Sequence, residues 1–384
     1  MDNNLKVKVF DTFVGELVFE DGEYIFRYLT EDKTKFISLT MPLRTKNYLH
    51  TKLHPIFEMH LPEGYLLSII KKHFAKIVKT DDFGLLQLIS SSITGRVTYE
   101  SKKAKKISPL SLDDLLHPKS EKLFDELVER FALSSPLSGV QPKVLAKVEN
   151  KATLKLEQYI VKSWGEDYKE LALNEYYCMK IVQYANIATP EFYLSDDEKL
   201  FIMKRFDILD DGSTLGFEDM CVLQAKQRED KYEGSYEQIA KTIHTFVSNK
   251  NKKTALINFF KMIVINNILQ NGDAHLKNFG LLYSDVNDIS LAPAYDVVST
   301  TVYIKNDVPA LHLLGSKKWW DKKFILRFGV ENCYLTNKEV KEHYDECLIA
   351  MGKVAQEISL RIKSEQNEEK LHVLEKLLEL CKYD

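Results

Sequence analysis

Three polar residues in the second half of the chain have the types and the spacing that phosphoryl transfer requires. Asp273 and Asn278 lie five residues apart in the segment NGDAHLKN, and Asp296 follows 18 residues later. In kinases an Asp accepts the proton of the attacking hydroxyl, an Asn about five residues on binds Mg²⁺, and a later Asp binds metal too. Asn, Gly and Asp are also common in turns. The order of all three residues nevertheless favours Asp273 as the base, with Asn278 and Asp296 as Mg²⁺ ligands.

A second group of residues has the types that hold nucleotide phosphates. The segment SGVQPK, residues 138–143, is a small Gly-containing turn before an expected strand, and its backbone N–H groups could cradle phosphates. It is neither G-x-G-x-x-G nor a Walker A sequence, so without its context a surface turn fits equally well. Lys162 ends the next strand and Glu175 lies on the helix that follows, the order of the Lys–Glu pair that orients ATP in kinases. Asn174, beside Glu175, leaves the partner of Lys162 open.

Other chemistries find little support in the sequence. His275 could act as a base, but Asp273 already fills that role, which favours packing within the loop. The histidines have no zinc-site spacing, and the five cysteines are scattered without a C-x-x-C pair, as expected of reduced thiols. The formal net charge of −3 argues against a general nucleic-acid binder. No apolar run reaches the ~18 residues of a membrane span, and the N-terminus does not resemble a signal peptide, so we expect a cytoplasmic protein without membrane contact.

The first hundred residues have the pattern of a small α+β domain. Residues 5–28 alternate between polar and apolar, and Asp21-Gly22 between two such runs predicts a β-hairpin. Residues 43–64 are rich in turn formers, and helical spacing follows over 65–78. Residues 101–120 are basic, then contain Pro and Ser, which predicts a linker.

The rest of the chain changes from mixed to helical. We expect a helix over 121–131, strands over 144–148 and 158–162, a helix over 171–184 and a strand over 199–204. Beyond residue 235 the pattern is mainly helical. It includes an apolar helix over 254–269 directly before the Asp273 loop and an amphipathic helix near the C-terminus. This order predicts a two-lobed kinase with the nucleotide between the lobes.

Several segments together resemble the HipA family of bacterial kinases. The matching stretches, in chain order, are FEMHLPEGYLL (57–67), SGVQPK (138–143), NEYYCMKIV (174–182), KRFD (204–207), EDMC (218–221), KYEGSY (231–236), NGDAHLKNFG (271–280) and LAPAYDVVST (291–300). The resemblance covers most of the chain and becomes loose past residue 305. It implies an α+β fold of the two-lobed, protein-kinase-like HipA type, with a small N-terminal domain over 1–105 and a kinase domain over 121–384. The N-lobe would cover about 121–205 and the mainly helical C-lobe about 206–384.

The resemblance also assigns roles within the site. Asp273 would be the catalytic base, Asn278 and Asp296 would bind Mg²⁺, and residues 202–206 would form the hinge that reads adenine through its backbone. The residues expected to contact ATP are Ser138, Gly139, Val140, Gln141, Lys143, Lys162, Met203, Lys204, Phe206, His275 and Lys277. Relatives can phosphorylate a serine of their own phosphate loop. Ser138 is the best match here and Ser135 the second, although Pro136 stands where relatives often carry another serine.

The partners implied by the resemblance are a protein substrate and an antitoxin. The substrate would be a translation protein such as an aminoacyl-tRNA synthetase. The antitoxin would be a HipB-like helix-turn-helix protein, through which alone the chain would meet DNA. Two other functions stay open from the residues. The NGD loop is also similar to that of aminoglycoside-type phosphotransferases, whose acidic pocket would suit a cationic small molecule. An inactive kinase acting as corepressor is the third interpretation, against which the intact Asp273, Asn278 and Asp296 set counts.

Overall fold

The structure is a computed structural model that describes residues 4–63, 67, 81–100, 110–120, 123–124, 126–127, 143–150 and 155–382. These residues form two compact units. Unit 1 comprises the chain up to Ser163, together with Ile202–Glu229 and Leu282–Val286. Unit 2 comprises Trp164–Phe201, Asp230–Leu281 and Asn287–Asp384. The helix expected over 65–78 and most of the helix expected over 121–131 lie outside the described residues.

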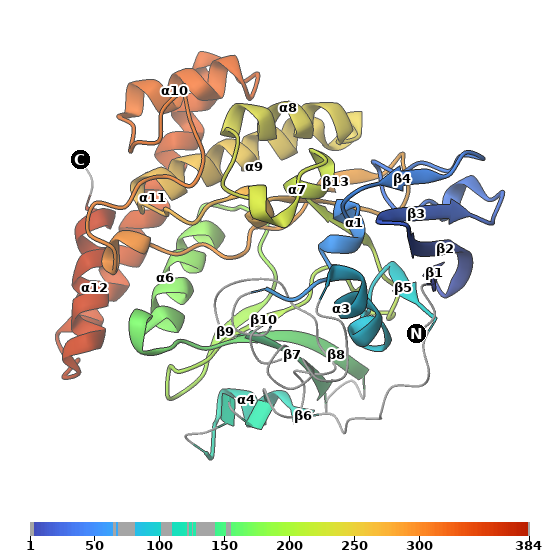
Figure 1. Cartoon of the computed structure of the whole chain (residues 1–384). Helices are drawn as coiled ribbons and strands as arrows, with labels where there is room; N and C mark the ends of the chain where they lie inside the picture. The colour runs from blue at the N-terminus through green and yellow to red at the C-terminus, as the bar shows by residue number, and fades with distance from the viewer. Residues whose placement is uncertain are drawn as a thin grey trace. The chain divides into compact units, whose positions relative to one another are not determined.

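Unit 1 begins with a five-stranded sheet in the order β4-β3-β2-β1-β5, visible in blue and cyan in Figure 1. Its strands are β1 (Asn4–Val9), β2 (Thr12–Glu20), β3 (Glu23–Tyr28), β4 (Tyr48–His50) and β5 (Val97–Tyr99). All four strand pairs are antiparallel. Two short helices, α1 (Pro55–Glu58) and α3 (Asp82–Ile89), belong to the same unit.

The alternating residues of this sheet behave as the sequence predicts. Leu5, Val7 and Val9 are buried, because successive side chains of a strand point to opposite faces. The turn between β2 and β3 places both Asp21 (φ 51°) and Gly22 (φ 82°) in the left-handed region. That conformation matches the twist of a tight hairpin and is readily adopted by Asp-Gly. The predicted hairpin is confirmed.

Unit 1 also contains the strands expected to lie beside the nucleotide. The hairpin of β7 (Lys143–Asn150) and β8 (Lys155–Lys162) is antiparallel, and β6 (Leu110–Ser111) pairs with β7 in parallel. On the other side of β8 lies β10 (Phe201–Lys204), whose residues from Ile202 onward belong to this unit. The unit is completed by β11 (Gly216–Asp219) and α7 (Met220–Leu223).

The linker predicted over 101–120 is wrong for its described second half. Residues 110–116 form β6 and the helix α4 (Leu112–Leu116). A capping box begins this helix, since Ser111 accepts a hydrogen bond from a helical N–H group and Asp114 accepts one from the backbone N–H of Ser111. Leu115 is fully buried. The Pro, Ser and Lys content conceals this pattern of a cap followed by apolar residues.

Unit 2 is mainly helical. Its helices are α6 (Leu171–Tyr184), α8 (Tyr236–Phe246), α9 (Asn249–Ile268), α10 (Lys322–Glu331), α11 (Asn337–Ile362) and α12 (Glu368–Cys381). Short strands accompany them: β9 (Phe192–Leu194), β13 (Ile289–Leu291) and part of β12 (Gly280–Tyr283). The predicted helix over 171–184 is confirmed, and the apolar helix predicted over 254–269 is the buried second part of α9.

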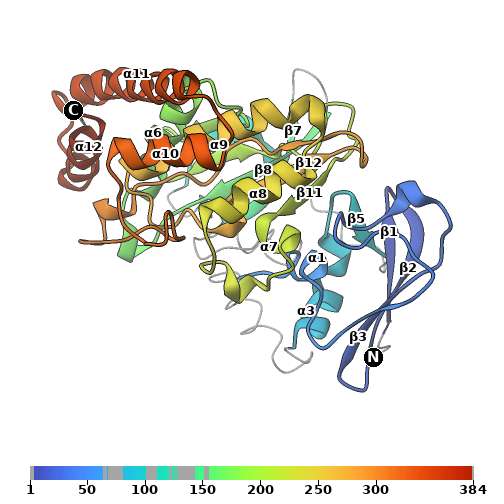
Figure 2. The same cartoon turned by 90° about the horizontal axis from the view of Figure 1, so that it is seen from above.

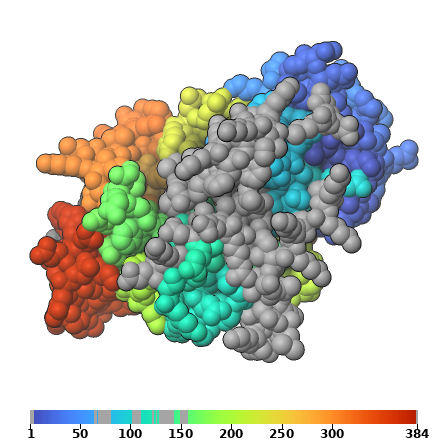
Figure 3. All heavy atoms as spheres, turned by 60° about the horizontal axis from the view of Figure 1, so that its bottom comes forward, coloured from blue at the N-terminus to red at the C-terminus, as the bar shows by residue number. Residues whose placement is uncertain are grey.

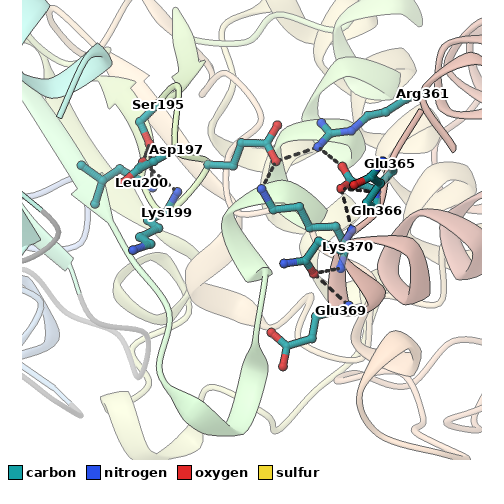
Figure 4. Close-up of polar contacts among 11 residues, drawn as sticks. Ser195, Asp197, Lys199, Leu200, Arg361, Glu365, Gln366, Glu369 and Lys370 are labelled. Atoms are coloured by element: carbon teal, nitrogen blue, oxygen red, sulfur yellow. Dashed lines mark hydrogen bonds and ion pairs between the residues drawn. The ribbon is translucent and has the colours of Figure 1, made fainter. Parts of the chain in front are cut away.

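The long helix α11 packs against α6, α9, α10 and α12, and in Figure 2 it runs along the upper edge of the view. In the space-filling view, α12 (red) lies beside α6 (green) on the surface (Figure 3). An ionic cluster joins the turn before β10 to the α11–α12 connection (Figure 4). In it, the Glu198 carboxylate accepts hydrogen bonds from Arg361 at 2.6 Å and from Lys370 at 2.7 Å. The cluster joins the C-terminal helix to the unit that contains the Asp273 loop.

Two further expectations concern the cysteines and membrane-spanning helices. None of the five cysteines forms a disulfide and all five are buried, as the sequence predicts for reduced thiols. None of the helices in the described part of the chain combines the length and the apolar character that a membrane crossing requires.

Candidate active site

The loop that carries Asp273 follows directly from the buried helix α9. Asn271 is buried at its start. The Asn271 side chain donates to Asn266 Oδ1 on the last turns of α9 at 2.9 Å and accepts a hydrogen bond from the Asp273 backbone N–H at 3.1 Å. A side-chain amide therefore connects the helix end to the backbone of the predicted base. The loop is held by a rigid element, as a catalytic residue requires.

Gly272 is needed because the loop passes close to another segment. Its backbone N–H donates to Thr300 Oγ1 at 2.8 Å, and the single proton of that hydroxyl faces two acceptors, Gln270 O and the Asp307 carboxylate. A Cβ atom on residue 272 would lie 2.0 Å from Asp307 Oδ2, far inside van der Waals contact. The glycine thus allows the N-G-D turn to dock on Thr300.

Asn278 brings the three predicted catalytic residues together. Its Nδ2 donates to the backbone carbonyl of Asp273 at 3.1 Å and to that of Asp296 at 3.4 Å. Asp296 has a φ of 61°, a left-handed conformation that Asp adopts more readily than most residues. With the amide nitrogen used in this way, the carbonyl oxygen of Asn278 and the carboxylate of Asp296 are oxygen donors of the kind that could hold Mg²⁺.

These oxygens fit a magnesium ion that also binds phosphate. Within the described ranges, no three His, Cys, Asp or Glu side chains gather in a group that could hold a metal ion. Mg²⁺ at nucleotide sites is held by one or two protein groups together with substrate phosphates and water. One carboxylate and one amide oxygen match that arrangement, in which the nucleotide would supply the remaining ligands.

The Asp273 carboxylate lies at the surface of unit 2. Its side chain is 46% exposed, so an external hydroxyl could reach it. Tyr232 donates a hydrogen bond to Asp273 Oδ1 at 2.6 Å, and His275 Nε2 lies 3.9 Å from the same oxygen. Burial lowers the pKa of His275 to about 3, which keeps the imidazole neutral at physiological pH. The ring of His275 packs edge-on against Tyr232 with centroids 5.1 Å apart.

The helix α6 carries the two candidate partners of Lys162, and both are fully buried. Asn174 is engaged within unit 2, because its side-chain amide exchanges two hydrogen bonds with the backbone of Ser299, three residues past Asp296. Glu175 and Lys162 belong to different units, so the proposed Lys–Glu pair stays a prediction.

The other expected nucleotide contacts lie on unit 1. Lys143 and Lys162 stand opposite each other at the open end of the β7–β8 hairpin, and Lys162 is buried. Met203 is buried in β10. The Lys204 ammonium lies 3.1 Å from the Glu157 carboxylate. Phe206 packs against Phe217 with ring centroids 5.4 Å apart.

The remaining expected contacts are only partly described. Ser138, Gly139, Val140, Gln141 and the second phosphorylation candidate Ser135 lie outside the described residues. Lys277 contributes its backbone carbonyl as acceptor for the Tyr295 hydroxyl at 2.7 Å.

Two residues at the site are absent from the sequence prediction. Tyr232 reaches Asp273 across 41 residues, and Thr300 reaches Gly272 across 28. Both lie inside stretches that carry the family resemblance, KYEGSY and LAPAYDVVST. Their place in these stretches could have marked them as candidates, but no spacing rule connects either residue to the Asp273 loop.

A buried helix that runs into an Asp-x-x-x-x-Asn loop, with a later Asp bonded through that Asn, is typical of protein-kinase-like phosphotransferases. The family comparison agrees. Residues 135–355 match the HipA-like C-terminal domain, and residues 5–100 match the HipA N-terminal domain. The chain therefore belongs to the HipA family.

Relatives described as putative kinases support the same class. A putative kinase of Sinorhizobium fredii is 28% identical over 349 residues, which cover 82% of this chain and 81% of that protein. A putative kinase of Haemophilus influenzae is 31% identical over 186 residues, 44% of this chain and 53% of the relative.

The solved structure is HipA of Shewanella oneidensis, in complex with HipB and operator DNA. It has a TM-score of 0.72 at 20% identity and covers 98% of this chain and 96% of that one. The predicted α+β fold of HipA type is confirmed.

Proposed function

We propose that the protein is an ATP-dependent serine/threonine protein kinase that acts as the toxin of a toxin–antitoxin system. The observation that carries this proposal is the position of Asn278, whose amide nitrogen binds the backbones of both Asp273 and Asp296. The residues proposed as the base and as the two metal ligands are thereby connected by hydrogen bonds. Family membership and the relatives described as putative kinases support the kinase class.

In the proposed reaction Asp273 accepts the proton of a serine or threonine hydroxyl. The acceptor oxygen then bonds to the γ-phosphorus of ATP, and the bond from that phosphorus to ADP breaks. Asn278 and Asp296 would hold Mg²⁺, which neutralises charge on the phosphates when bound. His275, neutral and buried, is not needed to move a proton. Lys143, Lys162, Met203, Lys204, Phe206, His275 and Lys277, with residues 138–141, are the proposed nucleotide contacts.

The proposed partners follow from the solved relative and from the family. That relative was crystallised with HipB and operator DNA, which supports a HipB-like antitoxin for this chain and DNA contact through the antitoxin. The proposed substrate is a translation protein such as an aminoacyl-tRNA synthetase. Self-modification would fall on Ser138 or Ser135, where a phosphate adds about −1.5 to −2 charges close to the phosphates of ATP.

The predicted domains, 1–105 and 121–384, are part of this proposal, with the first modulating the second. One contact supports such coupling. Ser38 Oγ and Leu39 N, from the first domain, donate hydrogen bonds to the buried carboxylate of Glu218, each at 2.8 Å. Glu218 adjoins Asp219, which caps α7.

The deciding experiment uses Asp273→Asn. Purified protein is incubated with γ-labelled ATP, Mg²⁺ and bacterial extract, and labelled proteins are identified by mass spectrometry. Wild type should label at least one protein on Ser or Thr. Asp273→Asn should label none while still binding nucleotide, because the base is lost and the metal ligands remain. Asp321→Asn, the same change at an exposed residue of unit 2, is the matched control. Label found only on small molecules, or equal labelling by Asp273→Asn, would refute the proposal.

A further inference from the structure

The Tyr232 hydroxyl stands in the position that a phosphate acceptor has to occupy. It donates to Asp273 Oδ1 at 2.6 Å. A general base must lie within about 2.6–3.2 Å of the hydroxyl whose proton it accepts. A phenolic hydroxyl of the chain itself therefore makes the hydrogen bond that a substrate hydroxyl would make.

The loop that carries Tyr232 is fixed on both of its sides. The backbone carbonyl of Lys231 accepts a hydrogen bond from Leu276 N, in the catalytic loop, at 3.0 Å. The carbonyl of Tyr232 accepts one from Lys317 Nζ at 3.1 Å, and the carbonyl of Gly234 accepts one from His312 N at 3.1 Å. The backbone is thus anchored to two segments of unit 2, which directs the side chain toward Asp273.

The side chain itself can still move away. Tyr232 is 39% exposed; its ring packs edge-on against His275, and Lys231 Nζ lies 5.3 Å from the ring centroid. Rotation about the side-chain bonds of a surface tyrosine takes picoseconds to nanoseconds and needs no backbone change. An incoming hydroxyl could therefore replace the phenol without disturbing the anchored loop.

We propose that Tyr232 guards the acceptor position. The Tyr232 hydroxyl is hydrogen-bonded to the Asp273 carboxylate when no protein substrate is bound, and the substrate hydroxyl displaces it. This inference rests on the proposed kinase function, in which Asp273 is the base.

Such a guard would prevent wasteful hydrolysis of ATP, because water can itself accept the γ-phosphoryl group. If water reached Asp273, the carboxylate would take its proton, the oxygen would bond to the γ-phosphorus, and ADP would leave, so that ATP would be hydrolysed to ADP and inorganic phosphate.

Two roles of the same hydrogen bond give opposite predictions. If Tyr232 guards the acceptor position, its removal opens Asp273 to water. If Tyr232 only orients the carboxylate, its removal slows every reaction that uses this base. Loss of a hydrogen bond to a charged group changes an equilibrium constant by about tenfold or more. The expected change in the rate of ATP hydrolysis is therefore about tenfold.

The test measures release of inorganic phosphate from Mg-ATP, without protein acceptor, by the full chain. Tyr232→Phe should hydrolyse ATP about tenfold faster than wild type and should still label protein in bacterial extract. Tyr334→Phe is the matched control, the same loss of a hydroxyl at a residue that is 57% exposed and packs on His244. It should behave like wild type. The double variant Tyr232→Phe with Asp273→Asn should not release phosphate faster than wild type, because the additional hydrolysis requires Asp273.

Unchanged or slower hydrolysis by Tyr232→Phe, in an otherwise active protein, would overturn the guard. Phosphate found on Tyr232 of wild type after incubation with Mg-ATP would also overturn it, since the phenol would then be an acceptor. If wild type and Asp273→Asn cannot be distinguished, the kinase proposal itself fails, and the guard fails with it.

A second measurement needs no turnover. In NMR spectra of protein labelled with ¹³C at tyrosine Cζ, the resonance of Tyr232 is the one that is missing in Tyr232→Phe. That resonance should shift in Asp273→Asn, because the charged acceptor of its hydroxyl is lost, and should stay in place in Tyr334→Phe. A Tyr232 resonance that is insensitive to Asp273→Asn would contradict the hydrogen bond on which the guard depends.

Discussion

Asn174 on α6 and Ser299, just past Asp296, are joined by a reciprocal pair of hydrogen bonds, each 2.9 Å long. The side-chain amide donates to the Ser299 carbonyl and accepts from the Ser299 N–H, as a neighbouring strand would. Asn174 is fully buried. The segment that follows the predicted metal ligand is therefore attached to a core helix by one side chain.

The first prediction is that Asn174→Asp destabilises unit 2. A carboxylate cannot donate to the Ser299 carbonyl, and it brings a charge into a buried position. An unsatisfied buried polar group together with this charge should lower the free energy of unfolding by about 2–5 kcal/mol. Urea denaturation measures the effect. Asn337→Asp, at the exposed start of α11, should change stability by less than about 0.5 kcal/mol. Equal stability of the two variants would refute the role of the pair.

The second prediction concerns Gly272 and uses another glycine as its control. Gly272→Ala places a Cβ 2.0 Å from Asp307 Oδ2 and 2.8 Å from Thr300 Oγ1, so the Thr300–Asp307 contact has to open. Overpacking of this kind costs about 1–3 kcal/mol. The same change at Gly352, within α11 and with open space around it, should stabilise by about 0.5–1 kcal/mol, since alanine favours a helix. Thermal melting should show a lower melting temperature for Gly272→Ala and a higher one for Gly352→Ala than for wild type.

The third prediction tests the metal role of Asp296. Asp296→Asn suits this site better than alanine, because residue 296 has a φ of 61° and Asn tolerates that conformation. Loss of the anionic ligand should weaken ATP binding about tenfold or more in the presence of Mg²⁺ and leave it nearly unchanged without the ion. Calorimetric titration with and without Mg²⁺ measures both affinities. If the variant keeps the full Mg²⁺ dependence of wild type, Asp296 is not a ligand.

Local patterns predicted the elements, whereas distant contacts were not predictable. The β2–β3 hairpin and α6 followed from turn chemistry and from apolar spacing, which act within a few residues. The β6–α4 segment was missed because its Pro- and Lys-rich surroundings conceal a capping box. Within the candidate site, Asp273, Asn278 and Asp296 could be proposed from the sequence because kinase chemistry fixes their order, and their roles stay a prediction. Tyr232 could not, since its contact with Asp273 depends on how the anchored loop folds back.

The last prediction concerns a buried carboxylate in unit 1. Glu218 is fully buried and accepts hydrogen bonds from Ser38 Oγ, Leu39 N and the Tyr283 hydroxyl, the last at 2.6 Å. Burial outweighs these donors and raises the pKa of Glu218 from its ordinary 4.5 to about 6. A carboxyl group whose pKa is higher in the folded state favours folding while it is protonated. This contribution is fully present below about pH 4.5 and is lost as the pH rises through about 6.

Replacing Glu218 with Gln should remove this pH dependence. Glutamine can accept from Leu39 N and Tyr283 through its oxygen and can donate to Ser38 Oγ, so the hydrogen bonds survive without a charge. Relative to wild type, Glu218→Gln should gain stability between about pH 4.5 and 7, by a total of roughly 2 kcal/mol, at about 1.4 kcal/mol for each unit of pKa. Urea unfolding at several pH values measures the difference between the two curves. Glu339→Gln is the control, because that partly exposed carboxylate has a pKa lowered to about 2 by Lys253 and Thr336, and its loss should give no gain in this pH range. A constant difference between wild type and Glu218→Gln across the range would show that Glu218 does not titrate there.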